Sequence, residues 1–195
     1  MTVDLSKIEQ ANTEALIGIS NVNGSGFADT LTGNSLANVL FGDAGNDTLF
    51  GGAGNDALEG GTGHDSLAGG TGADVLEGGE GIDTFNYSAG DGHDTIIDFA
   101  VGETVNIAGY NFYRSIAQIG SNVVVVFSSI DQLTFLNTDI ATVEAALPIG
   151  ISSEPTDGDD LLNGTSGADN INGLGGNDQI NGAARNHTES RGERK

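Results

Sequence analysis

The sequence contains no cysteine, no tryptophan and only two prolines, and aromatic residues make up 6% of its 195 residues. Without cysteine, no disulfide bond can stabilise the chain, so another device must hold it together. No apolar run approaches the roughly 20 residues that a membrane-spanning helix requires. The N-terminus also lacks the basic-then-apolar layout of a secretory signal peptide. We therefore expect no membrane insertion and no disulfide framework.

Basic residues are scarce as well. Six Lys and Arg stand against 28 Asp and Glu, which gives a net charge of −22. Four of the six basic residues fall in the last eleven positions, so residues 1–184 carry 26 acidic and two basic residues, a net charge of −24. A surface with this charge repels nucleic acid and anionic membranes and attracts cations. We therefore expect no nucleic-acid partner.

Glycine is abundant, with 32 residues, and much of it lies in a nine-residue repeat. High charge with few aromatic residues is typical of disorder, but here the acidic residues are periodic. An aspartate or asparagine recurs every nine residues, at Asp29, Asn38, Asp47, Asp56, Asp65, Asp74 and Asp83. Two positions later an apolar residue recurs, at Leu31, Leu40, Leu49, Leu58, Leu67, Leu76 and Phe85. Two columns kept in register over seven units indicate a repeat architecture.

The repeat is most regular in its middle. The four units from Gly51 to Asn86 read GGAGNDALE, GGTGHDSLA, GGTGADVLE and GGEGIDTFN, and the unit before them is GDAGNDTLF. The two earlier units, GSGFADTLT and GNSLANVLF, are looser. After two extra residues the period continues weakly, with Asp94 and then Glu103 at the acidic position. A second block then places acidic residues nine apart at Asp160, Asp169 and Asp178.

Glycine content divides the chain, since 17 of the 60 residues from 24 to 83 are glycine, against 4 of the 56 from 100 to 155. The glycine-poor part has strand candidates at 104–107, 123–127 and 132–136 and a helix candidate at 139–147. We predict a lead-in over 1–22, a repeat roll over 23–99, a capping β segment with a short helix over 100–150, a second, truncated roll over 151–184 and a disordered tail over 185–195. The tail is abruptly basic, which favours a frameshift or a premature end of the second block.

Each unit divides into a six-residue turn, GGxGxD, and a three-residue strand. Glycine permits positive φ, so the turn can curl and direct its carbonyl groups inward. If successive strands lie on opposite sides of a flattened coil, 18 residues complete one coil and the apolar column stacks inside. Asp47, Asp65 and Asp83 then lie along one edge of the coil, and Asp56 and Asp74 lie along the other.

A cation is needed to stabilise such a coil. The entropy lost by ordering nine backbone residues exceeds what one buried leucine contributes, and stacked carboxylates repel one another. A divalent ion between each pair of carboxylates reverses the sign of that repulsion. Hard carboxylate and carbonyl oxygens, without thiols, select Ca²⁺ over zinc or copper, and a flexible turn suits Ca²⁺ better than Mg²⁺. We therefore predict several bound Ca²⁺ ions.

These units, GGAGNDALE to GGEGIDTFN, resemble the RTX (hemolysin-type) calcium-binding repeat, and residues 94–147, opening DTIIDF, are similar to the segment that caps such repeats. The resemblance covers most of residues 17–182. It implies an all-β chain, a right-handed parallel β-roll (a β-helix-like solenoid) with a small β-rich cap containing one short helix. It also implies Ca²⁺ held between turns by carboxylates and turn carbonyls. The metal ligands that it implies are Asp29, Asp47, Asp56, Asp65, Asp74, Asp83, Asp160, Asp169 and Asp178, with weaker sites at Asn38 and Asp94.

The sequence predicts a calcium-binding module of a secreted bacterial protein, which folds on Ca²⁺ outside the cell and stabilises or presents its parent protein. The resemblance implies extracellular location through type I export. The chain has no H-E-x-x-H, G-x-S-x-G or Walker A motif, so we expect no enzymatic activity of its own.

Two alternatives stay open. The chain is the C-terminal module of a secreted protease, lipase or alginate epimerase whose catalytic domain is absent here, or it is a repeat block of a surface adhesin. In either case a glycan or cell-surface partner would be reached through the parent protein. His64 and His93 occupy the variable fifth position of the turn, and we expect both to be exposed and inert.

Overall fold

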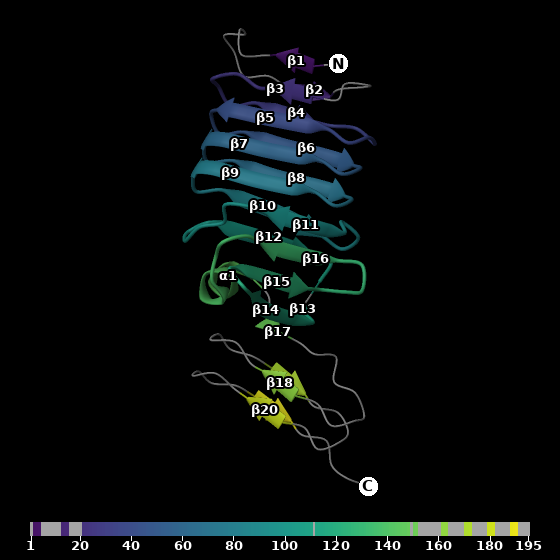
Figure 1. Cartoon of the computed structure of the whole chain (residues 1–195), viewed down its shortest axis with the longest axis vertical. Helices are drawn as coiled ribbons and strands as arrows, with labels where there is room; N and C mark the ends of the chain where they lie inside the picture. The colour runs from purple at the N-terminus through teal and green to yellow at the C-terminus, as the bar shows by residue number, and fades with distance from the viewer. Residues whose placement is uncertain are drawn as a thin grey trace.

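The computed structural model describes residues 21–110 and 113–148, together with the backbones of short strands outside these ranges. These residues form a parallel β-solenoid whose strands stack along the long axis, with the helix α1 (Ile140–Ala146) near the far end of the stack (Figure 1). Most of the predicted lead-in, and most of residues 151–195, lie outside the described residues. Within the described part, the predicted all-β solenoid is confirmed.

Two mainly parallel sheets form the solenoid, and successive repeats alternate between them. The nine-stranded sheet has the order β1 (Thr2–Asp4), β3 (Asn21–Asn23), β5 (Val39–Ala44), β7 (Ala57–Gly63), β9 (Val75–Gly81), β11 (His93–Ile96), β16 (Gln132–Phe135), β15 (Asn122–Val126) and β14 (Ser115–Ile119). The six-stranded sheet has the order β12 (Thr104–Ala108), β10 (Thr84–Ser88), β8 (Ser66–Thr71), β6 (Thr48–Ala53), β4 (Thr30–Thr32) and β2 (Thr13–Ala15).

The register of the strands follows the nine-residue repeat. Leu40 pairs with Leu58 in one sheet, and Leu49 pairs with Leu67 in the other, so neighbouring strands are two units apart. This confirms the prediction that 18 residues complete one coil. The offset becomes 20 where Phe85 pairs with Val105, because two extra residues, Tyr87 and Ser88, follow the unit that ends at Asn86.

The core is the apolar column of the repeat. The middle residue of each short strand points to one face, so the residue two positions after each acidic position turns inward. These side chains are at most 2% exposed, at Leu31, Leu40, Leu49, Leu58, Leu67, Leu76, Phe85 and Ile96.

β12, β15 and β16 lie at the three strand candidates of the glycine-poor segment. β14, β15 and β16 pair antiparallel, which ends the parallel stack. The helix α1 begins after Asp139, whose side chain accepts a hydrogen bond from the backbone N–H of Thr142 at 3.0 Å. Tyr87 and Phe127 are buried and lie with ring centroids 5.2 Å apart. The cap is therefore β-rich with one short helix.

Three further pairs of short strands are separate from the two large sheets. β13 (Phe112–Tyr113) pairs with β17 (Gly150–Ile151). In the second block, β18 (Leu161–Asn163) pairs with β20 (Gln179–Asn181) and β19 (Asn170–Asn172) pairs with β21 (Thr188–Ser190), again 18 residues apart. β21 falls within the tail for which we expected disorder. No helix in the described part of the chain is long and apolar enough to cross a membrane.

Candidate metal sites at the edges of the roll

The acidic position of the repeat forms one column along each edge of the solenoid. The backbone N–H of one acidic residue donates to the Oδ1 atom of the residue one coil later. In one column Asp29 donates to Asp47, Asp47 to Asp65 and Asp65 to Asp83, at 2.7–2.8 Å. In the other column Asn38 donates to Asp56, Asp56 to Asp74 and Asp74 to Asp94, at 2.7–3.0 Å. The predicted division of these residues between two edges is therefore correct.

Within each column, the second carboxylate oxygen has a different environment. The eight residues joined by these hydrogen bonds are at most 3% exposed. Among the described residues, buried side-chain oxygens without a hydrogen-bond partner occur only at the Oδ2 atoms of Asp47, Asp56, Asp65, Asp74 and Asp83. Buried polar atoms are almost always satisfied in native proteins, so five in regular succession require an explanation. They belong to the five most regular units of the repeat.

Glycine at the start of each turn makes room for these oxygens. A Cβ atom on Gly60 would lie 2.5 Å from the Oδ2 atom of Asp65 and 2.6 Å from the carbonyl oxygen of Gly78. Carboxylate and carbonyl oxygens of successive coils therefore converge on a space that only glycine leaves open. Such a cradle of hard oxygen donors fits Ca²⁺.

Burial disfavours the charged form of the carboxylates from Asp47 to Asp94 in the two columns. Burial is the main cause that raises the pKa of Asp47 to about 7; the charges of Asp65 and Asp29 also raise it, and a hydrogen bond from the backbone of Asp29 lowers it. Burial is also the main cause that raises the pKa of Asp74 to about 6 and that of Asp94 to about 8. Burial also raises the pKa values of Asp56, Asp65 and Asp83. A bound cation would reverse this preference.

The donor set consists of pairs of carboxylates and the carbonyl groups of the turns. Within the residues that the structure describes, no group of three or more His, Cys, Asp or Glu side chains is placed to hold a metal ion. Any cation at these edges would therefore take part of its coordination from backbone carbonyl oxygens, which Ca²⁺ accepts.

The first members of the two columns are satisfied by protein groups. The Oδ2 atom of Asp29 accepts hydrogen bonds from the backbone N–H of Ser25 at 2.6 Å and from its hydroxyl at 2.8 Å. The Oδ1 atom of Asn38 accepts one from the backbone N–H of Asn34 at 2.7 Å. The structure thus places Asp29 and Asn38 in the columns but in a different environment from the five residues that follow.

The last members of the columns also differ from the regular ones. Glu103 follows Asp83 in its column, since Thr84 pairs with Thr104. The Oε2 atom of Glu103 accepts a hydrogen bond from the backbone N–H of Ala100 at 2.8 Å. Asp94 is buried and holds the backbone of Asp74. The predicted ligands Asp160, Asp169 and Asp178 lie outside the described residues.

Sequence reasoning missed the side chains that hold the outer turn positions. Asn46 accepts a hydrogen bond from the backbone of His64 at 3.0 Å, and the Nδ1 atom of His64 accepts one from the backbone of Ile82 at 3.0 Å. His64 is exposed as predicted, but it bridges two coils and so is not inert. The 18-residue spacing of Asn46, His64 and Ile82 is a signal that could have revealed this ladder.

Asp98 and Asp131 were missed for another reason. Asp98 accepts hydrogen bonds from the backbone N–H groups of Gly78 and Gly79. The Oδ1 atom of Asp131 accepts from those of Gly90 and Gly92, and its Oδ2 atom accepts from the hydroxyls of Tyr110 and Ser128. Neither aspartate lies at the repeat position, so the period gives no signal for them.

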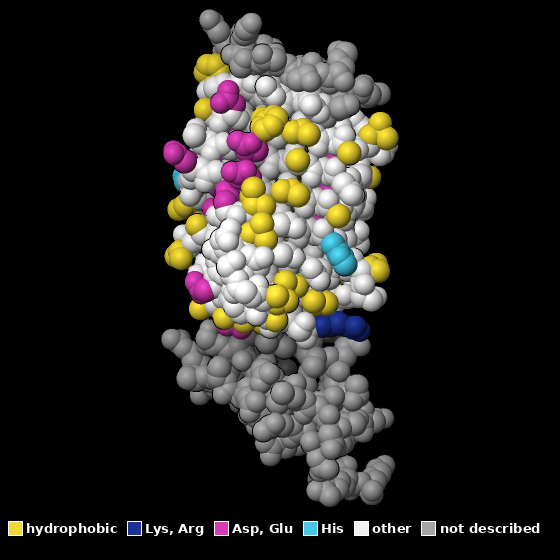
Figure 2. All heavy atoms as spheres, in the orientation of Figure 1, with side chains coloured by type: hydrophobic (Ala, Val, Ile, Leu, Met, Phe, Trp, Pro, Cys, Tyr) yellow, Lys and Arg dark blue, Asp and Glu magenta, His cyan; other side chains and the backbone are white. Residues whose placement is uncertain are grey.

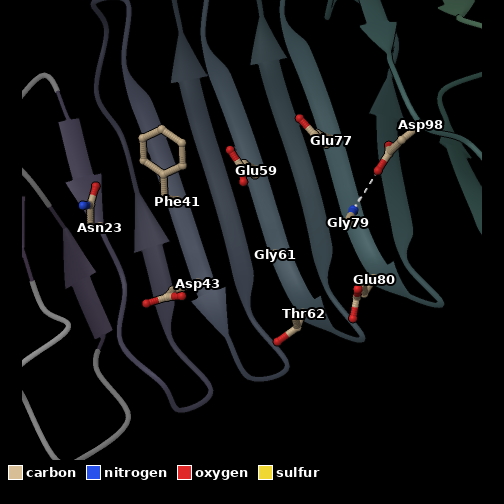
Figure 3. A pocket seen from close by; sticks show the side chains of 10 residues that line it. All are labelled: Asn23, Phe41, Asp43, Glu59, Gly61, Thr62, Glu77, Gly79, Glu80 and Asp98. Carbon is tan, nitrogen blue, oxygen red and sulfur yellow. Dashed lines mark hydrogen bonds between the residues drawn. The ribbon is translucent and has the colours of Figure 1, made fainter.

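A further acidic surface lies on the outer face of the nine-stranded sheet and includes residues of the repeat turns, such as Asp43 and Glu80. Glu59 and Glu77 are paired in register on β7 and β9, beside Asp43, Glu80 and Asp98 (Figure 3). Acidic side chains gather over the sheet in the space-filling view (Figure 2). Burial raises the pKa of Glu77, and the charges of Glu59 and Asp98 raise it further. This shallow groove adds to the negative charge around the columns.

The fold and the two columns define a parallel β-roll with stacked carboxylates along its edges. The family model for the RTX calcium-binding nonapeptide repeat matches residues 23–58, 50–85 and 155–184. The chain therefore carries RTX calcium-binding nonapeptide repeats, which form a β-solenoid. Proteins with these repeats bind Ca²⁺ and are typically secreted.

Among solved structures, the chain is similar to the solution structure of the AlgE6R3 subunit from the Azotobacter vinelandii mannuronan C5-epimerase. The two are 26% identical, and the match covers 68% of this chain and 92% of that chain, with a TM-score of 0.28. No match was found among curated proteins.

Proposed function

We propose that this chain is a module that binds several Ca²⁺ ions along the two edges of its roll and folds when it binds them outside the cell. The observation that carries the proposal is the set of five buried Oδ2 atoms without a partner, all at the regular turns. A buried carboxylate oxygen without a hydrogen bond is costly, and a cation removes that cost.

In this proposal Asp47, Asp65 and Asp83 hold ions along one edge, and Asp56 and Asp74 hold them along the other, together with turn carbonyl oxygens. Calcium supplies positive charge between carboxylates that otherwise repel. The Oδ1 atoms keep the spacing of the coils through their hydrogen bonds to the backbone, and the Oδ2 atoms remain for the ion. Each ion would thus link two successive coils.

Without calcium, the same chain repels itself. The buried carboxylates lack counter-charges, the outer groove adds further acidic groups, and the net charge of the chain is −22. Extracellular calcium modules bind at roughly 10⁻⁴–10⁻³ M, well above cytosolic calcium. A module that is unfolded inside the cell and folded outside suits export, and it would then stabilise or present its parent protein.

We extend the proposal to the second block, where Asp160, Asp169 and Asp178 continue the same nine-residue spacing. The repeat family matches this block as well, over residues 155–184. The units that we propose for the chain are the roll over 23–99, the cap over 100–150 and the second roll over 151–184.

Far-ultraviolet circular dichroism during a calcium titration tests the proposed function. In excess chelator the chain should lack most of its β signal, and the signal should appear cooperatively as calcium is added. Magnesium at the same concentrations serves as the control and should be much less effective. A complete β signal in chelator would contradict the proposal.

A further inference from the structure

The roll contains two kinds of turn, which differ in how the acidic position is satisfied. In the first two described turns, GSGFAD and GNSLAN, the second residue of the turn donates its backbone N–H to the acidic or amide residue at the sixth position. In the next five turns the Oδ2 atom of the sixth residue has no hydrogen-bond partner. We refer to these as closed and open turns.

The backbone conformation of the second residue separates the two kinds. In the open turns this residue has a φ between 77° and 110°, at Asp43, Gly52, Gly61, Gly70 and Gly79. This second residue is paired with a residue of the neighbouring strand. For example, Asp43 pairs with Gly61, and Gly52 pairs with Gly70. The strands before the closed turns, β3 and β4, have three residues each, whereas β5 to β9 have six or seven. In the open turns the second residue is therefore paired within the sheet, and at Gly79 its N–H donates to the side chain of Asp98. The Oδ2 atom of the sixth residue is left for another partner.

The fourth residue of the turn gives the sequence cause. In the open turns it is always glycine, with a φ between 114° and 154°, which side chains disfavour. In the closed turns it is Phe27 or Leu36, and neither has a positive φ. A bulky residue at this position keeps the turn out of the open conformation, and the second residue then turns its N–H toward the carboxylate.

We propose that Ser25 and Asn34 occupy the role of the cation at the first two turns, so that calcium binding begins at Asp47 and Asp56 and does not use Asp29 or Asn38. This inference rests on the proposed function for the open turns. It replaces the expectation that Asp29 is a calcium ligand. At Asp29 the hydroxyl and the N–H of Ser25 already supply two donors to the Oδ2 atom.

The consequence is that the coil holding Asp29 and Asn38 closes without calcium. Asp29 and Asn38 donate their backbone N–H groups to Asp47 and Asp56, the first residues of the open type in each column. The closed turns therefore orient the first two open carboxylates. They give calcium-driven folding a starting surface at this end of the roll.

Calcium stoichiometry of the full chain, measured by isothermal titration calorimetry, tests the proposal. Asp65→Asn removes an open-turn carboxylate and should lower the number of bound ions and raise the calcium midpoint. Asp29→Asn is the matched variant, and its amide oxygen can still accept from Ser25. It should leave both quantities unchanged, with an unaltered circular dichroism spectrum in calcium.

A second experiment tests whether a closed turn can be made to bind calcium. The double substitution Ser25→Gly and Phe27→Gly converts the turn to GGGGAD, which has the glycines of an open turn, and should add about one ion per chain. Loss of binding in Asp29→Asn similar to that in Asp65→Asn, or no added ion in the double variant, would overturn the inference. A wild-type chain that bound no calcium would instead contradict the proposed function.

Discussion

The aspartate at the sixth turn position performs two tasks with its two oxygens. In Asp65, the Oδ1 atom accepts the backbone N–H of Asp47 and so fixes the spacing of two coils. The Oδ2 atom is buried without a partner beside Gly60. Because only the second oxygen is left over, the fold can form the columns of carboxylates and still keep them available for cations.

Glycine occupies the second position of four of the five open turns, and Asp43 occupies it in the fifth, in each case with a positive φ. Gly61 has a φ of 105°, and a Cβ atom there would overlap the carbonyl oxygen of Asp43. We predict that Gly61→Ala lowers the free energy of unfolding by about 1–3 kcal/mol, measured by urea denaturation in saturating calcium. Gly26→Ala is the control, since no atom lies within 4 Å of the added group, and it should change stability by less than about 0.5 kcal/mol. Equal effects of the two substitutions would contradict this account.

For the strands and turns, the nine-residue period of the sequence predicts the contacts that repeat along the roll. It does not predict contacts that are not periodic. The 18-residue register, the two columns and the buried leucines follow from the spacing alone. The contact of Asp131 with Gly90 and Gly92 joins residues about 40 positions apart, outside any repeat. The closed turn at Ser25 depends on a backbone conformation that the acidic period does not reveal, so the period alone gives Asp29 the same expectation as the other aspartates.

The stacked apolar column should carry much of the stability of each coil. Leu67 is fully buried, and its replacement by alanine leaves a cavity in a close-packed core. We predict that Leu67→Ala destabilises the calcium-bound chain by about 2–5 kcal/mol in a denaturant titration. Leu36→Ala is the control, because Leu36 is 65% exposed and should cost little. A small effect at Leu67 would show that the leucine column is not the core.

For the whole molecule, the column carboxylates make folding depend on pH as well as on calcium. Three of the column carboxylates have pKa values raised to about 6 for Asp74, about 7 for Asp47 and about 8 for Asp94 in the roll. In an unfolded chain aspartate titrates near 3.9. A carboxyl group whose pKa is raised in the roll stabilises the calcium-free roll fully when the pH is below its pKa in the unfolded chain. This stabilisation is lost as the pH rises through 6 to 8.

We therefore predict that the chain in excess chelator has more β structure at pH 5 than at pH 8, as measured by circular dichroism. The calcium midpoint should rise as pH falls over the same window, because protons and calcium compete for the column carboxylates. A calcium-free chain whose β signal increased with pH would contradict the burial of uncompensated carboxylates along the edges.

Calcium binding along the two edges is tested most directly by a crystal structure of the chain grown with calcium, examined by anomalous scattering. We expect calcium peaks along both edges, with the Oδ2 atoms of Asp47, Asp56, Asp65, Asp74 and Asp83 about 2.3–2.6 Å from an ion. We expect no peak at Asp29, where Ser25 already donates. A roll of the same fold with only water beside those five oxygens would contradict calcium binding along the edges.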